Sequence, residues 1–245
     1  MFYFEKIDGK NILKSDLIKN ANAFFTTRDL CICDKGANNN LQIEKNQKII
    51  AKYLNITTEN LISPTQTHSA NIDIAIETHH EYPETDALIL AEKNLGIFLN
   101  FADCTPVILY DKKQNIGAIA HAGWRGTAQK IAPKTVQKMG VNFNTNPADV
   151  VAVIGPAIGF CCYNVGEEVY EKLSKTVNDF EGLYEIREGQ IFVDLKNINK
   201  RQLEEIGVKE IDVCPYCTIH DNDKFFSYRN ENATTLRHSA VFKLR

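Results

Sequence analysis

The sequence predicts a mixed α+β fold, because the strands that it indicates outnumber the helices and do not alternate regularly with them. The chain has 245 residues, of which 44% are hydrophobic and 24% charged. That composition is ordinary for a globular protein and provides enough chain for a sizeable core. The sequence contains no internal repeat and no linker rich in Pro, Gly or Ser. Length alone allows one large domain or two small ones.

The first half of the chain reads mostly as strands. A hairpin is expected over 2–13 with Asp8-Gly9 as its turn, and another strand is expected over 21–27. Residues 34–40 read as a loop, and the apolar spacing in 41–54 favours a helix. A strand should begin near Asn71, and short buried strands are expected at 86–91, 96–101, 106–111, 116–120 and 149–155.

The second half contains the clearest helical patterns. Apolar residues share one helical face over 128–139, where Pro133 should kink the helix or mark its first turn and Gly140 is the expected stop. Asp194 is a candidate N-cap. Two further helices and a closing strand are expected at 164–177, 194–207 and 234–244.

Charge and composition narrow the possible partners. The formal net charge is −3, the sequence pI is about 6.1, and no block of like charges occurs. We therefore expect neither nucleic acid nor a membrane as a partner. The N-terminal residues lack the apolar run of a signal peptide, and no segment is long enough to span a bilayer, so a cytoplasmic protein is expected. The seven cysteines should then be reduced thiols.

Three strong metal ligands lie at predicted strand ends, namely His68, Cys104 and His121. Their spacing fits no zinc finger, so the fold would have to assemble them. Two imidazoles and a thiolate suit zinc with a fourth position open for water. Gly123 and Gly126 allow tight turns that could present His121 into a cleft. Equally, a histidine at a strand end is often an ordinary polar residue, and a cysteine is often a small buried hydrophobe.

Five motifs together resemble one family. In their order and spacing along the chain, they resemble the YfiH-like laccase-domain family; they are QTH (66–68), ADCTP (102–106), AHAGWRGT (120–127), GPAIGFCCYNVG (155–166) and FSYRNE (226–231). The resemblance implies a single layered α+β domain over 1–245, similar to the catalytic domain of cytotoxic necrotizing toxins. It also implies a zinc site made by His68, Cys104 and His121, with one zinc ion per chain and copper only as an adventitious occupant.

The resemblance further implies an enzyme that acts on purine nucleosides. Its expected reactions are phosphorolysis of adenosine, inosine, guanosine or methylthioadenosine, and deamination of adenosine. The partners would be a nucleoside and phosphate, and the oligomeric state is left open. Arg28 matches the arginine of the family's Thr-Arg motif and is the first candidate for binding phosphate or substrate, although the loop that follows it differs from the family pattern.

The remaining candidates for substrate binding or catalysis could also have purely structural roles. Gln66, Arg125 and Arg229 are further candidates for substrate binding, although an arginine beside Trp or Tyr can simply pack against the ring. Asp103 could orient a ligand or act as a base, and it could equally cap a secondary-structure element.

The sequence also bears on three other functions. A multicopper phenol oxidase needs many histidines, and this chain has six and no His-x-His pair, which argues against that mechanism. An amide-bond hydrolase that edits peptidoglycan precursors could use Cys104 as nucleophile and His121 as base. A non-catalytic binding protein could use the same pocket.

The remaining cysteines allow weaker alternatives. Cys214 and Cys217 form a C-x-x-C pair that Cys31 and Cys33 could complete as a four-thiolate zinc site, although the second spacing is wrong for a zinc knuckle. Cys161-Cys162 lies in a loop with three glycines, which could approach a phosphate through backbone N–H groups or could simply be a turn.

Overall fold

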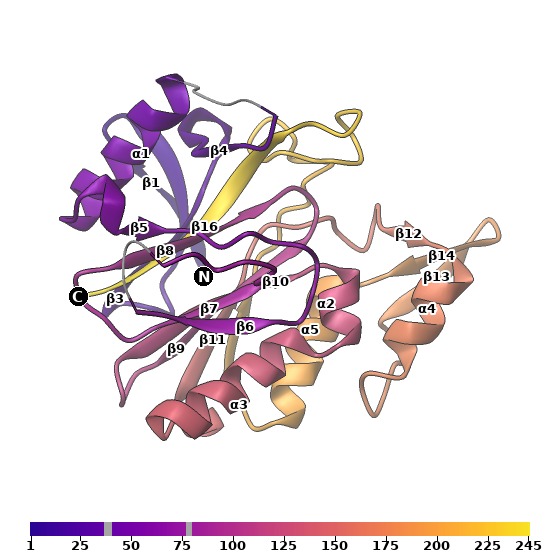
Figure 1. The fold of residues 1–245 in the computed structure, drawn as a ribbon. Coiled ribbons are helices and arrows are strands. Elements are labelled where there is room, and N and C mark those ends of the chain that lie inside the picture. The colour runs from indigo at the N-terminus through magenta and orange to yellow at the C-terminus, as the bar shows by residue number, and fades with distance from the viewer. Residues whose placement is uncertain (37–40, 77–79) are drawn as a thin grey trace.

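The computed structural model describes residues 1–36, 41–76 and 80–245 (Figure 1). Part of the expected loop over 34–40 therefore lies outside the described residues. Within the described part, the chain forms two large mixed sheets, one small sheet and helices that cover the outer faces. No helix there is long and apolar enough to cross a membrane.

The first large sheet contains both ends of the chain. Its strands are β1 (Phe2–Ile7), β2 (Lys10–Ser15), β3 (Ala21–Thr26), β4 (Cys33–Asp34), β5 (Leu61–Ile62), β8 (Gly96–Phe101) and β16 (Leu236–Leu244). Their order is β1-β2-β3-β16-β8-β5, and β4 pairs separately with β16. The closing strand β16 is antiparallel to both β3 and β8, so it joins the N-terminal hairpin to the middle of the chain.

The second large sheet contains the middle of the chain. Its strands are β6 (Ile72–Ala75), β7 (Ala87–Leu90), β9 (Thr105–Asp111), β10 (Ile116–Ala122), β11 (Val150–Ile154) and β15 (Glu210–Val213), and their order is β15-β11-β9-β10-β7-β6. Strands β11 and β15 are parallel, so the loops that follow them leave the same edge of the sheet. A small third sheet consists of β12 (Asn164–Val165), β13 (Tyr184–Arg187) and β14 (Gln190–Val193).

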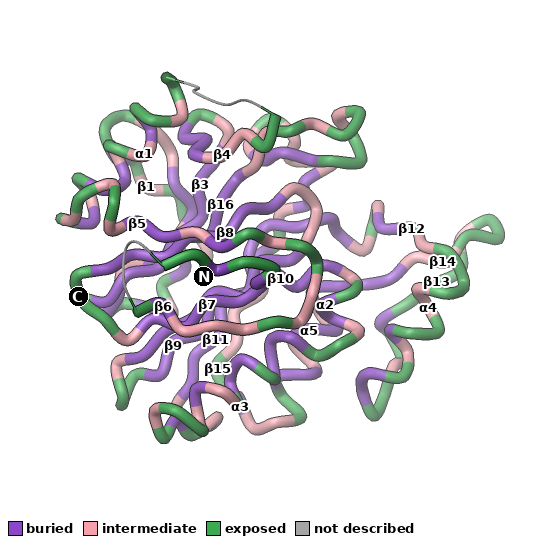
Figure 2. The backbone as a smooth tube through the Cα atoms, in the orientation of Figure 1, coloured by how far each residue is buried: buried purple, intermediate pink, exposed green. Residues whose placement is uncertain are grey.

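The helices complete a layered arrangement. They are α1 (Leu41–Leu54), α2 (Trp124–Ala128), α3 (Ile131–Phe143), α4 (Glu167–Ser174) and α5 (Leu195–Glu205), with 3-10 turns η1 (Arg28–Leu30), η2 (Thr58–Asn60) and η3 (Pro147–Asp149). Helix α1 packs on the outer face of the first sheet, and α3 and α5 pack on the outer face of the second. Figure 2 shows the resulting pattern, with buried central strands and exposed helix surfaces.

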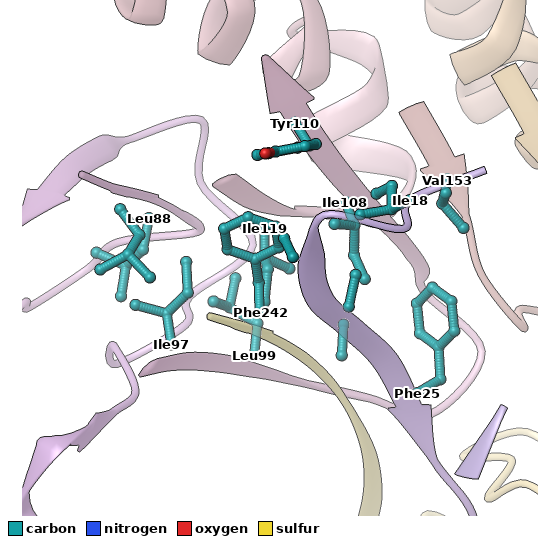
Figure 3. Packing of buried hydrophobic residues seen from close by; sticks show 14 of the residues in the cluster. Ile18, Phe25, Leu88, Ile97, Leu99, Ile108, Tyr110, Ile119, Val153 and Phe242 are labelled. Atoms are coloured by element: carbon teal, nitrogen blue, oxygen red, sulfur yellow. The ribbon is translucent and has the colours of Figure 1, made fainter. Parts of the chain in front are cut away.

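The main hydrophobic core lies between the two large sheets (Figure 3). Leu99 and Phe242 from the first sheet pack in the same cluster as Ile108 and Ile119 from the second. The sheets approach closely at Gly117 of β10, where an added Cβ atom would lie 2.0 Å from Cζ of Phe242. This position therefore accepts no side chain without repacking.

Most of the elements expected from the sequence are confirmed. The N-terminal hairpin, the helix over 41–54 and the buried central strands form as expected. Asp194 caps α5, since its side chain accepts a hydrogen bond from the backbone of Asn197 at 3.0 Å. Pro133 lies in the first turn of α3, which is one of its two expected positions.

Two helices have other boundaries than predicted. Helix α3 does not stop at Gly140 but continues to Phe143, because Asn144 adopts the left-handed conformation (φ 56°) and donates its N–H to the carbonyl of Gly140. The helix expected over 164–177 is shorter, since its first residues form strand β12. Strands β13 to β15 were not predicted, because they are short and largely exposed or half-buried.

The close approach of the sheets predicts the stability of a glycine variant. Gly117→Ala should lower the free energy of unfolding by about 1–3 kcal/mol, because the added methyl group must displace the Phe242 ring. Gly166→Ala is the matched control, since a Cβ atom there meets nothing within 4 Å; it should cost only a few tenths of a kcal/mol at the N-cap of α4. Chemical denaturation measures both, and equal stabilities would contradict the packing described.

Candidate metal centre

The three expected ligands come together although they lie on different segments. His68 lies in the loop before β6, Cys104 lies in the turn that joins β8 to β9, and His121 lies near the end of β10. Their ligand atoms all lie within 4.8 Å of one another. The two imidazole rings meet edge to face with centroids 4.8 Å apart. The group can therefore hold a metal ion between two nitrogen atoms and one sulfur atom.

Gly123 explains part of the Gly-Trp-Arg-Gly motif. It is the N-cap of α2, and an added Cβ atom would lie 2.8 Å from Sγ of Cys104 and 3.3 Å from Cδ2 of His68. A side chain here would therefore push into the ligand group. The first glycine of the motif leaves this space free, and the helix that follows begins directly beside the sulfur atom.

A buried carboxylate that the sequence analysis missed fixes His121. Asp86 is fully buried, and its Oδ1 lies 2.7 Å from Nδ1 of His121. An ionised carboxylate only accepts hydrogen bonds, so Nδ1 carries the proton and Nε2 is left to bind a metal. The backbone N–H of His121 also donates to the carbonyl oxygen of Asp86 at 2.7 Å.

The same carboxylate also holds the loop that carries His68. It accepts the backbone N–H groups of Thr67 at 3.1 Å, His68 at 3.1 Å and Ser69 at 2.7 Å, and the hydroxyl of Ser69 at 2.7 Å. These bonds support the left-handed backbone of His68, which has φ 61°. Burial raises the pKa of Asp86, but bonds from His121 and Ser69 outweigh it and hold the pKa well below its usual range.

Electrostatics favour a charged pair at the centre. Burial raises the pKa of the Cys104 thiol, but His121 and His68 overcome this and lower it to about 6. Burial lowers the pKa of His121, whereas Cys104 and Asp86 raise it to about 9. Cys104 is therefore predisposed to be a thiolate, which is the form that binds a metal and also the form that acts as a nucleophile.

The ligands open into a cavity of 390 Å³ that combines aromatic and cationic side chains. It is lined by Lys35, His68, Asn100, Ala102, Asp103, Cys104, His121, Trp124, Ile158, Tyr163, Tyr228, Arg229 and Arg237. A polar group at the base and rings on the walls are typical of a site for a small aromatic molecule.

Arg28 lies in a different hollow, of 690 Å³, which contains none of the three ligands. Its guanidinium makes a bidentate ion pair with Glu231, with both N–O distances at 2.9 Å, and lies over the ring of Phe226. Burial raises the pKa of Glu231, but Arg28, the Ser227 backbone and other hydrogen bonds lower it to about 2. The structure therefore does not bring Arg28 to the metal centre, and its role in binding phosphate stays a prediction.

Gln66 and Arg125 do not line the cavity either. The side-chain amide of Gln66 makes two hydrogen bonds with the backbone of Asn100, at 2.8 and 3.0 Å, and so ties the His68 loop to β8. Arg125 is exposed and lies over the Trp124 ring at 4.3 Å. Both side chains thus contact other residues of the protein and lie outside the lining of the cavity.

Asp103 and Arg229 do line the cavity, and they are joined to each other. The carboxylate of Asp103 accepts the hydroxyl of Thr218 at 2.6 Å and the backbone N–H of Arg229 at 2.7 Å. The guanidinium of Arg229 donates to the carbonyl and side-chain oxygens of Asn164 at 2.9 and 2.8 Å. Asp103 therefore braces the turn that carries Cys104 against the C-terminal segments.

The four-thiolate alternative is wrong for the described cysteines. Among the described residues there are two groups of possible metal ligands, one of His68, Cys104 and His121 and one of Cys161, Cys162, Cys217 and His220. Cys31, Cys33 and Cys214 belong to neither group. The thiol of Cys31 instead lies near the carbonyl oxygens of Cys33 and Arg237, at 3.2 and 3.3 Å.

Comparison with known proteins identifies the family. The model of a family described as multi-copper polyphenol oxidoreductase laccase matches residues 25–245. The chain belongs to this family. The resemblance to YfiH-like laccase-domain proteins is thereby confirmed.

Similar proteins in the family have been named as enzymes. The chain is 34% identical over 201 residues to a purine nucleoside phosphorylase of Bacteroides thetaiotaomicron, covering 77% of this chain and 74% of that one. It is 28% identical over 253 residues to adenosine deaminase RL5 of an unknown prokaryote, covering 94% of each. The solved structure of YlmD from Geobacillus stearothermophilus matches with a TM-score of 0.91 at 29% identity, over 99% of this chain and 98% of that one.

The structural match confirms a mixed α/β fold of the YlmD type. The family's description as a multi-copper enzyme does not fit the metal-ligating side chains of the described residues. The group with Cys104 offers two histidines, and the group with Cys217 offers one. A blue-copper site together with a three-copper cluster needs far more imidazole ligands.

The contacts of Asp86 predict its effect on metal binding. Asp86→Asn should weaken binding of Zn²⁺ by about 10–100-fold, because an amide NH₂ must then face at least one of the donors that now converge on the carboxylate. Competition with a chelator measures the affinity.

A second buried aspartate provides the control. Asp111 is also fully buried, and it accepts only backbone N–H groups, from Lys113 and Gln114. Asp111→Asn should leave the affinity for Zn²⁺ unchanged. A folded Asp86→Asn protein that binds Zn²⁺ as tightly as the unaltered protein would show that this carboxylate does not orient the ligands.

Proposed function

We propose that the protein is a zinc-dependent enzyme of purine nucleosides, which catalyses phosphorolysis of adenosine, inosine, guanosine or methylthioadenosine and deamination of adenosine. The observation that carries the proposal is the His68–Cys104–His121 group at the base of an aromatic, cation-lined cavity. The names of the relatives support it. The free thiol of Cys104 fits a cytoplasmic enzyme, because thiols stay reduced in the cytoplasm.

The donor set fits zinc. Two imidazoles and one thiolate are borderline-soft ligands, and three protein ligands are typical of a catalytic zinc site, whereas four are typical of a structural one. The Asp86 carboxylate accepts the hydrogen bond of Nδ1–H of His121 and so leaves Nε2 free to face the centre. When bound, zinc would supply a Lewis acid at the base of the cavity.

The chain's own residues would bind and orient the substrate. The rings of Trp124, Tyr163 and Tyr228 line the cavity and can stack against a purine. Lys35 and Arg237 line the same cavity and provide positive charge for phosphate. Arg28 lines the other hollow, so we propose Lys35 and Arg237 as the phosphate-binding groups.

A hydrolase of amide bonds is a second candidate, since the electrostatics of Cys104 and His121 also suit a nucleophile and its base. The likeness to the catalytic domain of the necrotizing toxins stays a prediction. Phenol oxidation and a purely binding role have no specific observation in their favour.

The metal and the substrate can be tested together. The zinc-loaded protein, incubated with adenosine and phosphate, should release adenine and ribose 1-phosphate, and with adenosine and water it should release inosine and ammonia. Chelation should abolish both reactions, added Zn²⁺ should restore them, and Cys104→Ala should lose both. Full nucleoside turnover by metal-free protein would contradict the proposal, and cleavage of muramyl peptides alone would favour the hydrolase.

The phosphate site can be tested separately. Arg237→Gln should raise the KM for phosphate about tenfold or more, as expected for loss of one charged hydrogen bond, while deamination is largely retained because it uses no phosphate. Arg28→Gln is the matched variant and should leave the KM for phosphate nearly unchanged. The reverse pattern would assign phosphate binding to Arg28 instead.

A further inference from the structure

Four metal-ligating side chains gather at a second place, outside the cavity. Cys161 and Cys162 lie in the loop after β11, and Cys217 and His220 lie in the loop after β15. Their ligand atoms all lie within 4.8 Å of one another. None of the four lines the 390 Å³ cavity.

The topology explains why these distant residues meet. Strands β11 and β15 are parallel neighbours, so both loops leave the sheet at the same edge. The pairing continues past the strands, because Ala157 and Cys217 form an isolated parallel bridge and the N–H of Thr218 donates to the carbonyl of Ala157 at 3.1 Å. The backbone thus sets the distance between the two cysteine loops.

The spacing of the donors fits a tetrahedral ion. Sγ of Cys162 lies 3.3 Å from Nε2 of His220, and Sγ of Cys161 lies 3.6 Å from its Nδ1. Around a zinc ion with ordinary bond lengths, ligand atoms are separated by about 3.5–3.8 Å. Only one of the two nitrogens can bind the ion, so the exposed imidazole of His220 must turn that nitrogen toward both sulfur atoms.

The environment of Cys217 suits a bound thiolate. The N–H of Gly159 donates to its Sγ at 3.2 Å, and an added Cβ atom at Gly159 would lie 3.0 Å from Sγ of Cys161 and 3.2 Å from Sγ of Cys217. Such donors to sulfur are what orients and stabilises a metal-bound thiolate.

The residues from Cys217 to His220 also form a compact turn. The N–H of Asp221 donates to the carbonyl of Cys217 at 2.7 Å, and the N–H of Cys217 donates to the carboxylate of Asp221 at 3.0 Å. This closed turn holds the C-x-x-H pair with both side chains on the same side as the cysteine loop. Ligand pairs with two residues between them are common in structural zinc sites.

We propose that Cys161, Cys162, Cys217 and His220 form a second zinc site, with a structural role. Four protein ligands of the Cys₃His type close the coordination of the ion, which distinguishes this site from the three-ligand centre. The proposal is independent of the proposed nucleoside activity. It raises the expected zinc content from about one to about two ions per chain.

Such an ion would brace one wall of the catalytic cavity. The first loop also carries Ile158 and Tyr163, which line the cavity. The second carries Thr218, whose hydroxyl holds the Asp103 carboxylate beside Cys104. Joining the two loops through an ion would therefore fix the cavity wall and the turn that carries Cys104.

Zinc content after removal of each site separately tests the proposal. Protein prepared with zinc and a reductant should carry about two ions per chain, His68→Ala and His220→Ala about one each, and the double variant none. His220 is exposed, so its replacement leaves the core intact. His220→Cys should restore the second ion, since thiolate also binds zinc, and Cys33→Ser should keep both, since Cys33 belongs to neither group.

Cobalt and intact mass provide readouts that do not depend on activity. In the His68→Ala protein, Co²⁺ should give the strong near-ultraviolet absorption of several thiolate–cobalt bonds, and this should disappear when His220→Ala is added. Loss of all bound zinc in the His68→Ala protein would overturn the proposal. An intact mass that is lower by two hydrogen atoms, measured for metal-free protein prepared with reductant, would also overturn it, because it would indicate a disulfide among the three cysteines.

Discussion

The buried carboxylate of Asp86 is the contact on which the metal centre depends. It meets the ring of His121 on one side and the backbone of the loop that carries His68 on the other. A buried carboxylate without partners would be costly, but this one accepts enough hydrogen bonds to stay ionised. The same set of bonds therefore stabilises the fold locally, fixes the tautomer of His121 and positions two of the three ligands.

The layered sheets place the third ligand. Strand β8 belongs to the first large sheet and β9 to the second, so the turn that carries Cys104 crosses from one sheet to the other. Tight packing between the sheets, which Gly117 permits, holds β10 against Phe242 of β16. Hydrogen bonds from Asp103 to the C-terminal segments brace it further, and the proposed second ion would act on the same side of the cavity.

Local patterns in the sequence predicted most elements, and the motifs predicted the three ligands. The role of Asp86 could not be predicted, because it depends on the register of β7 against β10, which sets Asp86 opposite His121. Read locally, it is only a polar residue before a buried strand. The Cys217–His220 pair was missed because the C-x-x-C spacing drew attention to Cys214, which is buried outside both ligand groups.

We propose that the group held by Asp86 is a catalytic metal centre. Crystals of the zinc-loaded protein, measured with X-rays on both sides of the zinc absorption edge, test it most directly. We expect an anomalous difference peak bonded to His68, to Sγ of Cys104 and to Nε2 of His121, with the ion facing the 390 Å³ cavity. If crystals of protein that cleaves nucleosides show no peak between these three side chains, the group is not the catalytic metal centre.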